Sequence, residues 1–276
     1  MSESGPIKID LHSLVRSRAG RWGALLPRFA VYPLERLACQ KELNALLSRL
    51  YPRRGADFCR ALLSELDITL DVAGTDSLPA CGRALFVSNH PLGGLDGISM
   101  LAFLGGHYGC EPYFVVNDLL MAVEPLSGNF VPVSIFGRQR RTASEALTAA
   151  LASDAPIVIY PAGLVSRRAD NGTIADLKWN KTFINKAIES RRDIVPVYFG
   201  GTNSAFFYRL ARLRRRLHIP FNLEMTLLPR EMLRRRHCTF RLSIGAPVPW
   251  SSLNGGSHAA DEAARLRTIV YNLADK

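Results

Sequence analysis

Residues 84–104 read ALFVSNHPLGGLDGISMLAFL: a short apolar run, a glycine-rich turn and a second, longer apolar run. The first run predicts a buried strand and the last a helix, so the stretch forms a strand–turn–helix unit. His90 follows the strand, and Asp96 precedes the helix. Such a pair can deprotonate a hydroxyl near neutral pH, because histidine titrates there and a carboxylate can fix its tautomer. A histidine and an aspartate in a loop are more often structural, but glycines let backbone approach a substrate closely and favour a functional site.

Short apolar strands and helices alternate from Ile68 onward. The expected strands are residues 68–72, 83–88, 113–116, 130–133, 157–160, 194–199, 222–227 and 239–244, and the expected helices are 96–105, 141–153, 181–190 and 259–272. This alternation predicts an α/β fold with a mixed, largely parallel sheet flanked by helices. In such sheets the ligand crevice lies beyond the carboxyl ends of the strands, which is where His90 and Pro161-Ala162-Gly163 follow their strands.

The first 67 residues differ from the rest and predict an N-terminal helical segment, which leaves residues 68–276 as the α/β domain. Apolar residues recur at helical spacing between Leu11 and Tyr51, with few strand signals. The stretch that contains Arg16, Arg18, Arg21 and Trp22 is basic and aromatic, which suits a membrane interface. A helical cap packed on the core is an equally good interpretation, and the two do not exclude each other.

The composition limits the classes of protein to which the chain can belong. It has 276 residues, 47% of them hydrophobic, so it can bury a large core, and its apolar runs are too short to span a bilayer. The N-terminus lacks the pattern of a signal peptide. Five scattered cysteines without C-x-x-C spacing argue against a disulfide framework or a zinc site and fit a reducing cytosol. The net charge is +11, and most of the basic residues are arginines. This favours a phosphate-bearing partner, which can be nucleic acid, anionic lipid or a phosphorylated cofactor.

Three further stretches place distinctive residues next to expected strands. PVSIFGRQRR (132–141) puts arginines before a helix, where a basic loop can hold a phosphate, although a solvated arginine cluster explains it equally well. YPAGLVSRR (160–168) is a strand end, a bend of small residues and a pair of arginines. DIVPVYFGG (193–201) is a core strand that runs into two glycines.

These blocks, in this order, resemble the glycerolipid acyltransferase superfamily of the 1-acylglycerol-3-phosphate acyltransferase type. That family has a strand ending in Asn-His followed by an aspartate, a loop ending in arginine, a Phe-Pro-Glu-Gly-Thr-Arg-Ser block and a Val-Pro-Val strand. The similar positions are Asn89-His90 with Asp96, Phe136-Gly137-Arg138, Tyr160-Pro161-Ala162-Gly163 with Ser166-Arg167, and Val195-Pro196-Val197. The resemblance covers residues 83–201, and it is specific because four blocks occur in order at plausible spacing.

The chain departs from the family pattern at three places, one of which is the looser spacing of the second block. Five residues separate His90 from Asp96 where the family has four, and Ala162 stands where the family has glutamate. A bacterial branch with His-Pro-x-Gly-Gly-x-Asp/Glu-Gly and Phe-Pro-Ala-Gly-x-Val-Ser resembles the chain more closely. It includes hemolysin-like proteins and O-acyltransferases for lyso-aminolipids. The missing glutamate predicts an acceptor other than glycerol 3-phosphate, with a bulkier or differently charged head group.

The resemblance implies an O-acyltransferase that moves a fatty acyl group from acyl-ACP or acyl-CoA to a hydroxyl of a lysolipid, either a lysophospholipid or a lyso-aminolipid, in membrane lipid synthesis. His90 is then the general base, and Asp96 holds its imidazole. The implied substrate-binding residues are Asn89, Gly93, Gly94, Arg138, Gly163, Ser166 and Arg167. Arg138 and Arg167 would grip the acceptor anion, and backbone N–H groups around Gly163 would stabilise the oxyanion. We expect no metal site and no cofactor besides the thioester co-substrate.

Arginine runs at 209–216 and 234–236 extend this picture. Each arginine near an anionic membrane contributes about 1 kcal/mol to binding, and the runs also suit the acidic surface of an acyl carrier protein. A plainly solvated basic face is the alternative. We therefore expect a peripheral protein on the cytoplasmic face of the inner membrane, with an anionic membrane surface, a lysolipid and an acyl carrier protein or CoA thioester as partners.

Two other classes of function stay open on the sequence alone. The basic charge suits a nucleic-acid-binding α/β protein, but the arginines lack interleaved aromatic residues, so we expect no nucleic-acid partner. His90 and Asp96 also suit a metal-dependent hydrolase. Against this, only His107 lies nearby in the sequence, and no metal-ligand spacing is present.

Overall fold

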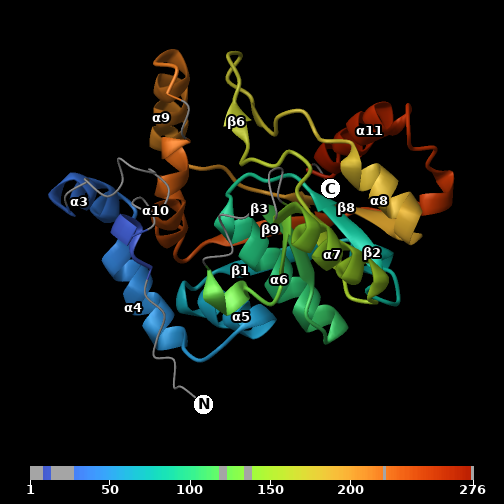
Figure 1. The fold of residues 1–276 in the computed structure, drawn as a ribbon, viewed down its shortest axis with the longest axis horizontal. Coiled ribbons are helices and arrows are strands. Elements are labelled where there is room, and N and C mark those ends of the chain that lie inside the picture. Colours follow the sequence, from blue (N-terminus) through green and yellow to red (C-terminus); the bar gives the residue numbers. More distant parts are fainter. Residues whose placement is uncertain (1–8, 14–27, 118–122, 134–138, 220–221, 275–276) are drawn as a thin grey trace. The chain divides into compact units, whose positions relative to one another are not determined.

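The computed structural model describes residues 9–13, 28–117, 123–133, 139–219 and 222–274 (Figure 1). The chain divides into two units, and each is described by itself. One unit lies within residues 1–53 and 203–236, and the other comprises residues 54–202 and 237–276. These limits differ from the expected division at residue 67, because helix α5 (Gly55–Glu65) packs on α6 (Gly94–Tyr108) in the second unit.

The second unit is built on a seven-stranded sheet in the order β1-β9-β8-β2-β5-β3-β4. Its strands are β1 (Thr69–Ala73), β2 (Ala84–Ser88), β3 (Tyr113–Asn117), β4 (Phe130–Val133), β5 (Ile157–Ile159), β8 (Asp193–Phe199) and β9 (Thr239–Ile244). The five strands from β8 to β4 are parallel, whereas β9 is antiparallel to β8 and parallel to β1. The prediction of a mixed, largely parallel sheet flanked by helices is confirmed.

Alternation along β2 sends its side chains to both faces of the sheet. Leu85 and Val87 are fully buried in the core that α7 (Gln139–Ala152), α8 (Thr182–Ser190) and α11 (Ala259–Tyr271) cover. Phe86 lies on the other face, where its ring contacts that of Tyr108 in α6 at a centroid distance of 6.2 Å. A strand that is buried on both faces has a continuous apolar sequence, which is why this strand can be predicted from the sequence.

Parallel strands bring their carboxyl ends to one edge of the sheet. Leu85 of β2 is in register with Ile157 of β5 on one side and with Ile194 of β8 on the other. The residues that follow these three strands therefore meet at the same edge, as expected for a ligand crevice of this architecture. Just beyond β5, the two-residue strands β6 (Arg167–Arg168) and β7 (Ile174–Ala175) form an antiparallel hairpin.

The first unit is helical in its described residues. It contains α3 (Arg28–Leu37), α4 (Gln40–Leu50), α9 (Ala205–Arg216), the 3-10 helix η4 (Leu223–Leu227) and α10 (Leu228–Leu233). The prediction of a strand at 222–227 is wrong, because η4 occupies this range and runs straight into α10. A short apolar run does not distinguish strand from helix by periodicity, and Pro229 in the first turn of α10 favours a helix start.

No helix among the described residues is long and apolar enough to cross a lipid bilayer. The N-terminal stretch with Arg16, Arg18, Arg21 and Trp22, for which the sequence predicts a membrane-interface or capping role, lies outside the described residues.

Candidate active site

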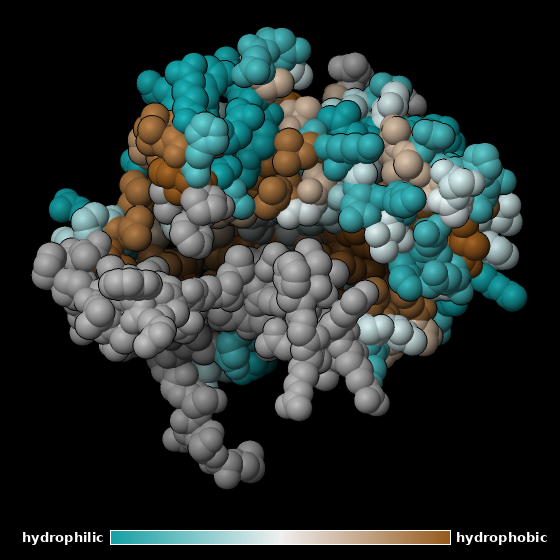
Figure 2. Space-filling model, turned by 45° about the horizontal axis from the view of Figure 1, so that its top comes forward, coloured by the Kyte–Doolittle hydropathy of each residue, from teal (hydrophilic) through white to brown (hydrophobic). Residues whose placement is uncertain are grey.

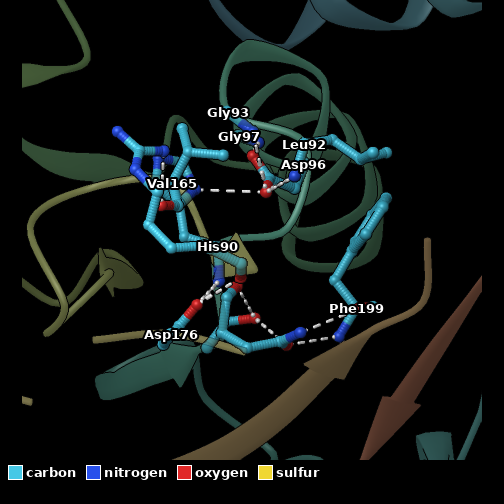
Figure 3. Close-up of polar contacts among 12 residues, drawn as sticks. His90, Leu92, Gly93, Asp96, Gly97, Val165, Asp176 and Phe199 are labelled. Carbon is cyan, nitrogen blue, oxygen red and sulfur yellow. Dashed lines mark hydrogen bonds and ion pairs between the residues drawn. The ribbon is translucent and has the colours of Figure 1, made fainter. Parts of the chain in front are cut away.

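His90 and Asp96 contact each other just beyond the carboxyl end of β2 (Figure 3). His90 Nδ1 lies 3.1 Å from Asp96 Oδ2. The Asp96 side chain is fully buried, whereas that of His90 is 17% exposed, so the imidazole is the member of the pair that a substrate can reach. When Nδ1 carries the proton and donates it to Asp96, the lone pair of Nε2 is left to accept a proton.

The glycine-rich turn fixes the Asp96 carboxylate. Oδ2 accepts the N–H groups of Leu92 (3.0 Å) and Gly93 (3.2 Å), and Oδ1 accepts the N–H of Gly97 (2.9 Å). Gly93 has a φ of 79°, a conformation in which a residue with a side chain is strained. The carboxylate also lies in the first turn of α6, where the helix dipole favours negative charge. The turn therefore holds the buried Asp96 carboxylate in place next to the imidazole of His90.

The surroundings of His90 set its proton affinity. Burial lowers the pKa of the imidazole, but the charge of Asp96, its hydrogen bond and the charge of Asp176 together outweigh burial, so the pKa of His90 is raised above its ordinary value. Arg167 acts in the opposite direction. The positive form of His90 is thus stabilised at the position where a general base must receive a proton.

The ring of Tyr160 stacks on the imidazole of His90, with centroids 4.1 Å apart and an interplanar angle of 22°. Its hydroxyl is buried and has no hydrogen-bond partner among the described residues. Burial raises the pKa of Tyr160 well above its ordinary value, so the hydroxyl stays protonated. Tyr160 therefore orients the imidazole by stacking and keeps one unused donor beside it.

A second buried carboxylate, Asp176, joins the loop after β5 to the loop after β2. Its Oδ1 accepts the backbone N–H of His90 at 3.1 Å (Figure 3). The same oxygen accepts the hydroxyl of Ser166 at 2.5 Å, and Oδ2 accepts Nε1–H of Trp179 at 3.0 Å. The N–H of Ser166 in turn donates to the carbonyl of His90 at 2.8 Å. The two loops are therefore locked together around the histidine backbone.

Several residues expected to bind substrate make contacts within the protein. The Asn89 amide donates to the carbonyl of Phe199 at 2.9 Å and accepts its N–H at 2.7 Å, so this side chain ties β2 to β8. The Gly163 N–H, expected near the oxyanion, donates to the Tyr160 carbonyl at 3.0 Å. Around the Cα atoms of Gly94 and Gly163 a side chain would meet open space, so both positions leave room for a ligand. Their substrate contacts stay predictions.

The two arginines expected to grip the acceptor differ in what the structure describes. Arg167 is buried, its Nη1 donates to the Val165 carbonyl at 2.9 Å, and its charge acts on His90. Arg138 lies outside the described residues. Arg168, the neighbour of Arg167, is exposed and donates to the Gly172 carbonyl at 3.3 Å.

Sequence reasoning did not single out Asp176 as a site residue, and it quoted Tyr160 only as the start of a block. Asp176 lies 86 positions from the backbone N–H that it accepts, and no local pattern in the sequence marks it. Tyr160 carries a usable signal, because it directly follows β5 at the sheet edge where ligands bind. In the described ranges, no group of three or more His, Cys, Asp or Glu side chains is arranged to hold a metal ion.

Comparisons with known proteins relate nearly the whole chain to acyltransferases. The acyltransferase family matches residues 14–275. Two relatives, from Phocaeicola vulgatus and Bacteroides thetaiotaomicron, are each named lyso-glycine lipid O-acyltransferase. They are 41% and 40% identical over 273 residues, and the match covers 99% of this chain and 98% and 100% of theirs. The crystal structure of the 1-acyl-sn-glycerophosphate acyltransferase PlsC from Thermotoga maritima matches 96% of both chains with a TM-score of 0.50 at 14% identity, which shows the fold. The family resemblance inferred from the four sequence blocks is confirmed, and the chain belongs to the acyltransferase family.

Proposed function

We propose that this acyltransferase moves a fatty acyl group from a thioester to a hydroxyl of a lysolipid. The observation that carries the proposal is the contact of His90 Nδ1 with the buried carboxylate of Asp96, which leaves Nε2 of the partly exposed imidazole to act as the base. The lysolipid acceptor is supported by the two relatives named lyso-glycine lipid O-acyltransferase, which align with nearly the whole chain.

In the proposed reaction, His90 Nε2 takes the proton of the acceptor hydroxyl while the hydroxyl oxygen attacks the thioester carbonyl carbon. A new C–O bond forms, and the carbonyl oxygen becomes an oxyanion. Collapse of this intermediate breaks the C–S bond, and the imidazolium returns its proton to the departing thiolate. Asp96 stabilises the imidazolium between the two proton transfers. Direct attack by the acceptor needs no covalent acyl-enzyme.

The acceptor is proposed to carry an anionic head group. Arg167 is buried close enough to His90 to lower its pKa, and Ala162 adds no negative charge to the same loop. A guanidinium beside the base favours a carboxylate or phosphate on the acceptor. A glycine joined to a lipid through its nitrogen retains a carboxylate, so an amino-acid lysolipid meets this requirement. Glycerol 3-phosphate is also anionic, and we place the amino-acid lysolipid ahead of it because both relatives are named for a lyso-glycine lipid.

The direct test is transfer by the purified protein with acyl-ACP and acyl-CoA as separate donors. The acceptors are lyso-glycine lipid, lysophosphatidate and glycerol 3-phosphate, and products are identified by mass spectrometry. We expect product with a lysolipid, and the donor that supports it identifies the thioester partner. Transfer to glycerol 3-phosphate that exceeds transfer to every lysolipid would overturn the proposed acceptor. Failure of both donors with all lysolipids would overturn the proposed function.

The pH dependence of kcat/KM is expected to report the raised pKa of His90. The base acts in its neutral form, so activity is present above its pKa and is lost as the pH falls through it. The midpoint of this loss should lie above the ordinary histidine value of about 6.5. Asp176→Asn removes one charge that raises the pKa, so the midpoint should move to lower pH. The matched control is Asp170→Asn, at an exposed position in the turn of the β6–β7 hairpin that Asp176 follows. A midpoint that does not move in Asp176→Asn, or moves upward, contradicts the assignment.

Replacement of Arg167 is expected to weaken acceptor binding more than donor binding. Loss of one charge-assisted hydrogen bond raises the acceptor KM by about tenfold or more in Arg167→Gln, while the donor KM changes little. Arg167→Lys keeps the charge and should recover part of the loss. Steady-state kinetics with both substrates varied measures the two constants, and the exposed neighbour in Arg168→Gln is the control. Equal changes in both KM values would show that Arg167 acts on the site as a whole and not on the acceptor.

A further inference from the structure

Helix α9 has a hydrophobic stripe on its exposed side, separate from the face by which it packs. Phe206, Leu213 and Leu217 are 42%, 52% and 61% exposed. Together with the half-buried Leu210 they follow the spacing i, i+4, i+7, i+11, which lines up side chains along one side of a helix. In Figure 2, brown hydrophobic surface borders teal hydrophilic surface in the region of α9. We propose that this side of α9 is a docking surface for an anionic lipid bilayer.

One face of α9 is buried, and hydrogen bonds within its own unit hold the start of the helix. Phe207, Tyr208 and Ala211 are buried, and Ser204 caps the helix start by accepting the Phe207 N–H at 3.3 Å. The Ser204 hydroxyl donates to Glu231 at 2.7 Å. These contacts fix the rotation of the helix about its axis. The stripe is therefore held outward by the fold.

The far end of α9 is fixed in the same way. Arg214 Nε donates to the fully buried carboxylate of Glu224 at 2.9 Å, and Arg214 Nη1 donates to the Ile219 carbonyl at 3.0 Å. Arg214 belongs to the arginine run at 209–216, but its side chain makes contacts inside the unit. The arginines that remain on the outside of α9 need a different explanation.

Two of those arginines line one flank of the hydrophobic stripe. Arg209 and Arg216 are exposed and seven positions apart, so they share one side of the helix, and each follows a stripe residue by three positions. Arg212 lies between them and is partly exposed. A helix with an apolar stripe bordered by arginines lies in the plane of a membrane interface, where the stripe enters the acyl region and the guanidinium groups meet lipid phosphates. The net charge of +11 adds long-range attraction to an anionic surface.

The test is co-sedimentation of the full-length protein with sucrose-loaded vesicles of phosphatidylglycerol and phosphatidylethanolamine, compared with pure phosphatidylcholine. We expect binding to the anionic vesicles that falls at high salt, because salt screens the arginine contacts. Leu213→Gln with Leu217→Gln should lower the partition coefficient by about tenfold or more, since two apolar side chains no longer enter the bilayer. The matched control is Leu177→Gln, an exposed leucine of the other unit.

Charge is tested by a second pair of variants with equal change of net charge. Arg209→Gln with Arg216→Gln should lower binding to anionic vesicles by roughly fivefold for each arginine. Arg60→Gln with Arg265→Gln, at exposed positions of the other unit, should change it little. Equal binding of the α9 variants and their controls, or no binding of the wild type, would overturn the proposal. So would loss of binding to a purified acyl carrier protein in the α9 variants while their vesicle binding persists.

This inference rests on the proposed function only in that a lysolipid acceptor is found in a bilayer, and the two can fail separately. Transfer to a lysolipid dispersed in detergent micelles measures the activity of the catalytic centre without vesicles. The α9 variants should retain this activity and lose activity on vesicle-embedded acceptor. Vesicle binding with no transfer by any form would overturn the proposed function and leave the docking surface standing.

Discussion

Replacement of His90 by alanine is expected to lower kcat for acyl transfer by about 10² to 10⁴, the usual contribution of a general base. The reason is geometric, because Nδ1 contacts Asp96 and Nε2 of the same ring is left to take the proton of the acceptor hydroxyl. The fold should persist, because the imidazole is partly exposed and the backbone bonds of His90 to Asp176 and Ser166 do not involve its side chain. Thermal unfolding and single-turnover transfer measure the two effects.

Two controls separate chemistry from disturbance of the structure. His107→Ala, at an exposed position of α6, should keep near wild-type turnover. Imidazole added to His90→Ala should restore part of the activity, because it supplies the missing base in the space that the ring vacates. A His90→Ala variant with wild-type turnover would show that another group removes the proton.

Asp96→Asn is expected to harm both activity and stability. The carboxylate accepts three backbone N–H groups and faces the histidine, and an amide has only one acceptor oxygen for them. Its NH₂ group must then point at other donors inside the protein, which costs about 1–3 kcal/mol. Turnover should fall severely, though by less than in His90→Ala, because the base is still present but poorly oriented.

The pH profile gives this variant a distinctive signature. The charge and the hydrogen bond of Asp96 both raise the pKa of His90, so the acid-side midpoint of the remaining activity should move to lower pH. Urea unfolding measures the stability change, and Asp76→Asn, at an exposed position, is the control. Unchanged stability together with an unchanged pH midpoint would show that Asp96 neither anchors the turn nor acts on the histidine.

The strand, turn and helix around His90 could be predicted from the sequence because each has a local cause. β2 is apolar throughout because both faces of the sheet are covered, and Gly93 is needed where φ is positive. The pairing of His90 with Asp96 follows from the short turn that separates them. For the same reason the expected helices at 96–105 and 259–272 correspond closely to α6 and α11.

The rest of the site depends on contacts between distant parts of the chain. Asp176 reaches His90 only through the hairpin after β5, whose strands have two residues each and leave no periodic pattern. Asn89 was expected at the substrate, but β8 passes beside it and its amide pairs with the Phe199 backbone. The misassigned strand at 222–227 has the same origin, because Glu224 in this run is buried against Arg214 and not in a sheet.

The pairing of β1 with β9 determines when during synthesis the sheet can be completed. Among the strands that the structure describes, β1 is at one edge of the sheet, and its neighbour β9 begins only at Thr239. A nascent chain therefore carries His90 and Asp96 early, while β1 lacks its partner strand until β9 has been synthesised and has left the ribosome. An unpaired strand edge is a template for other chains. A product that terminates before Thr239 retains His90 and Asp96 but not the strand that protects β1, so its expected fate is aggregation and degradation by cellular proteases.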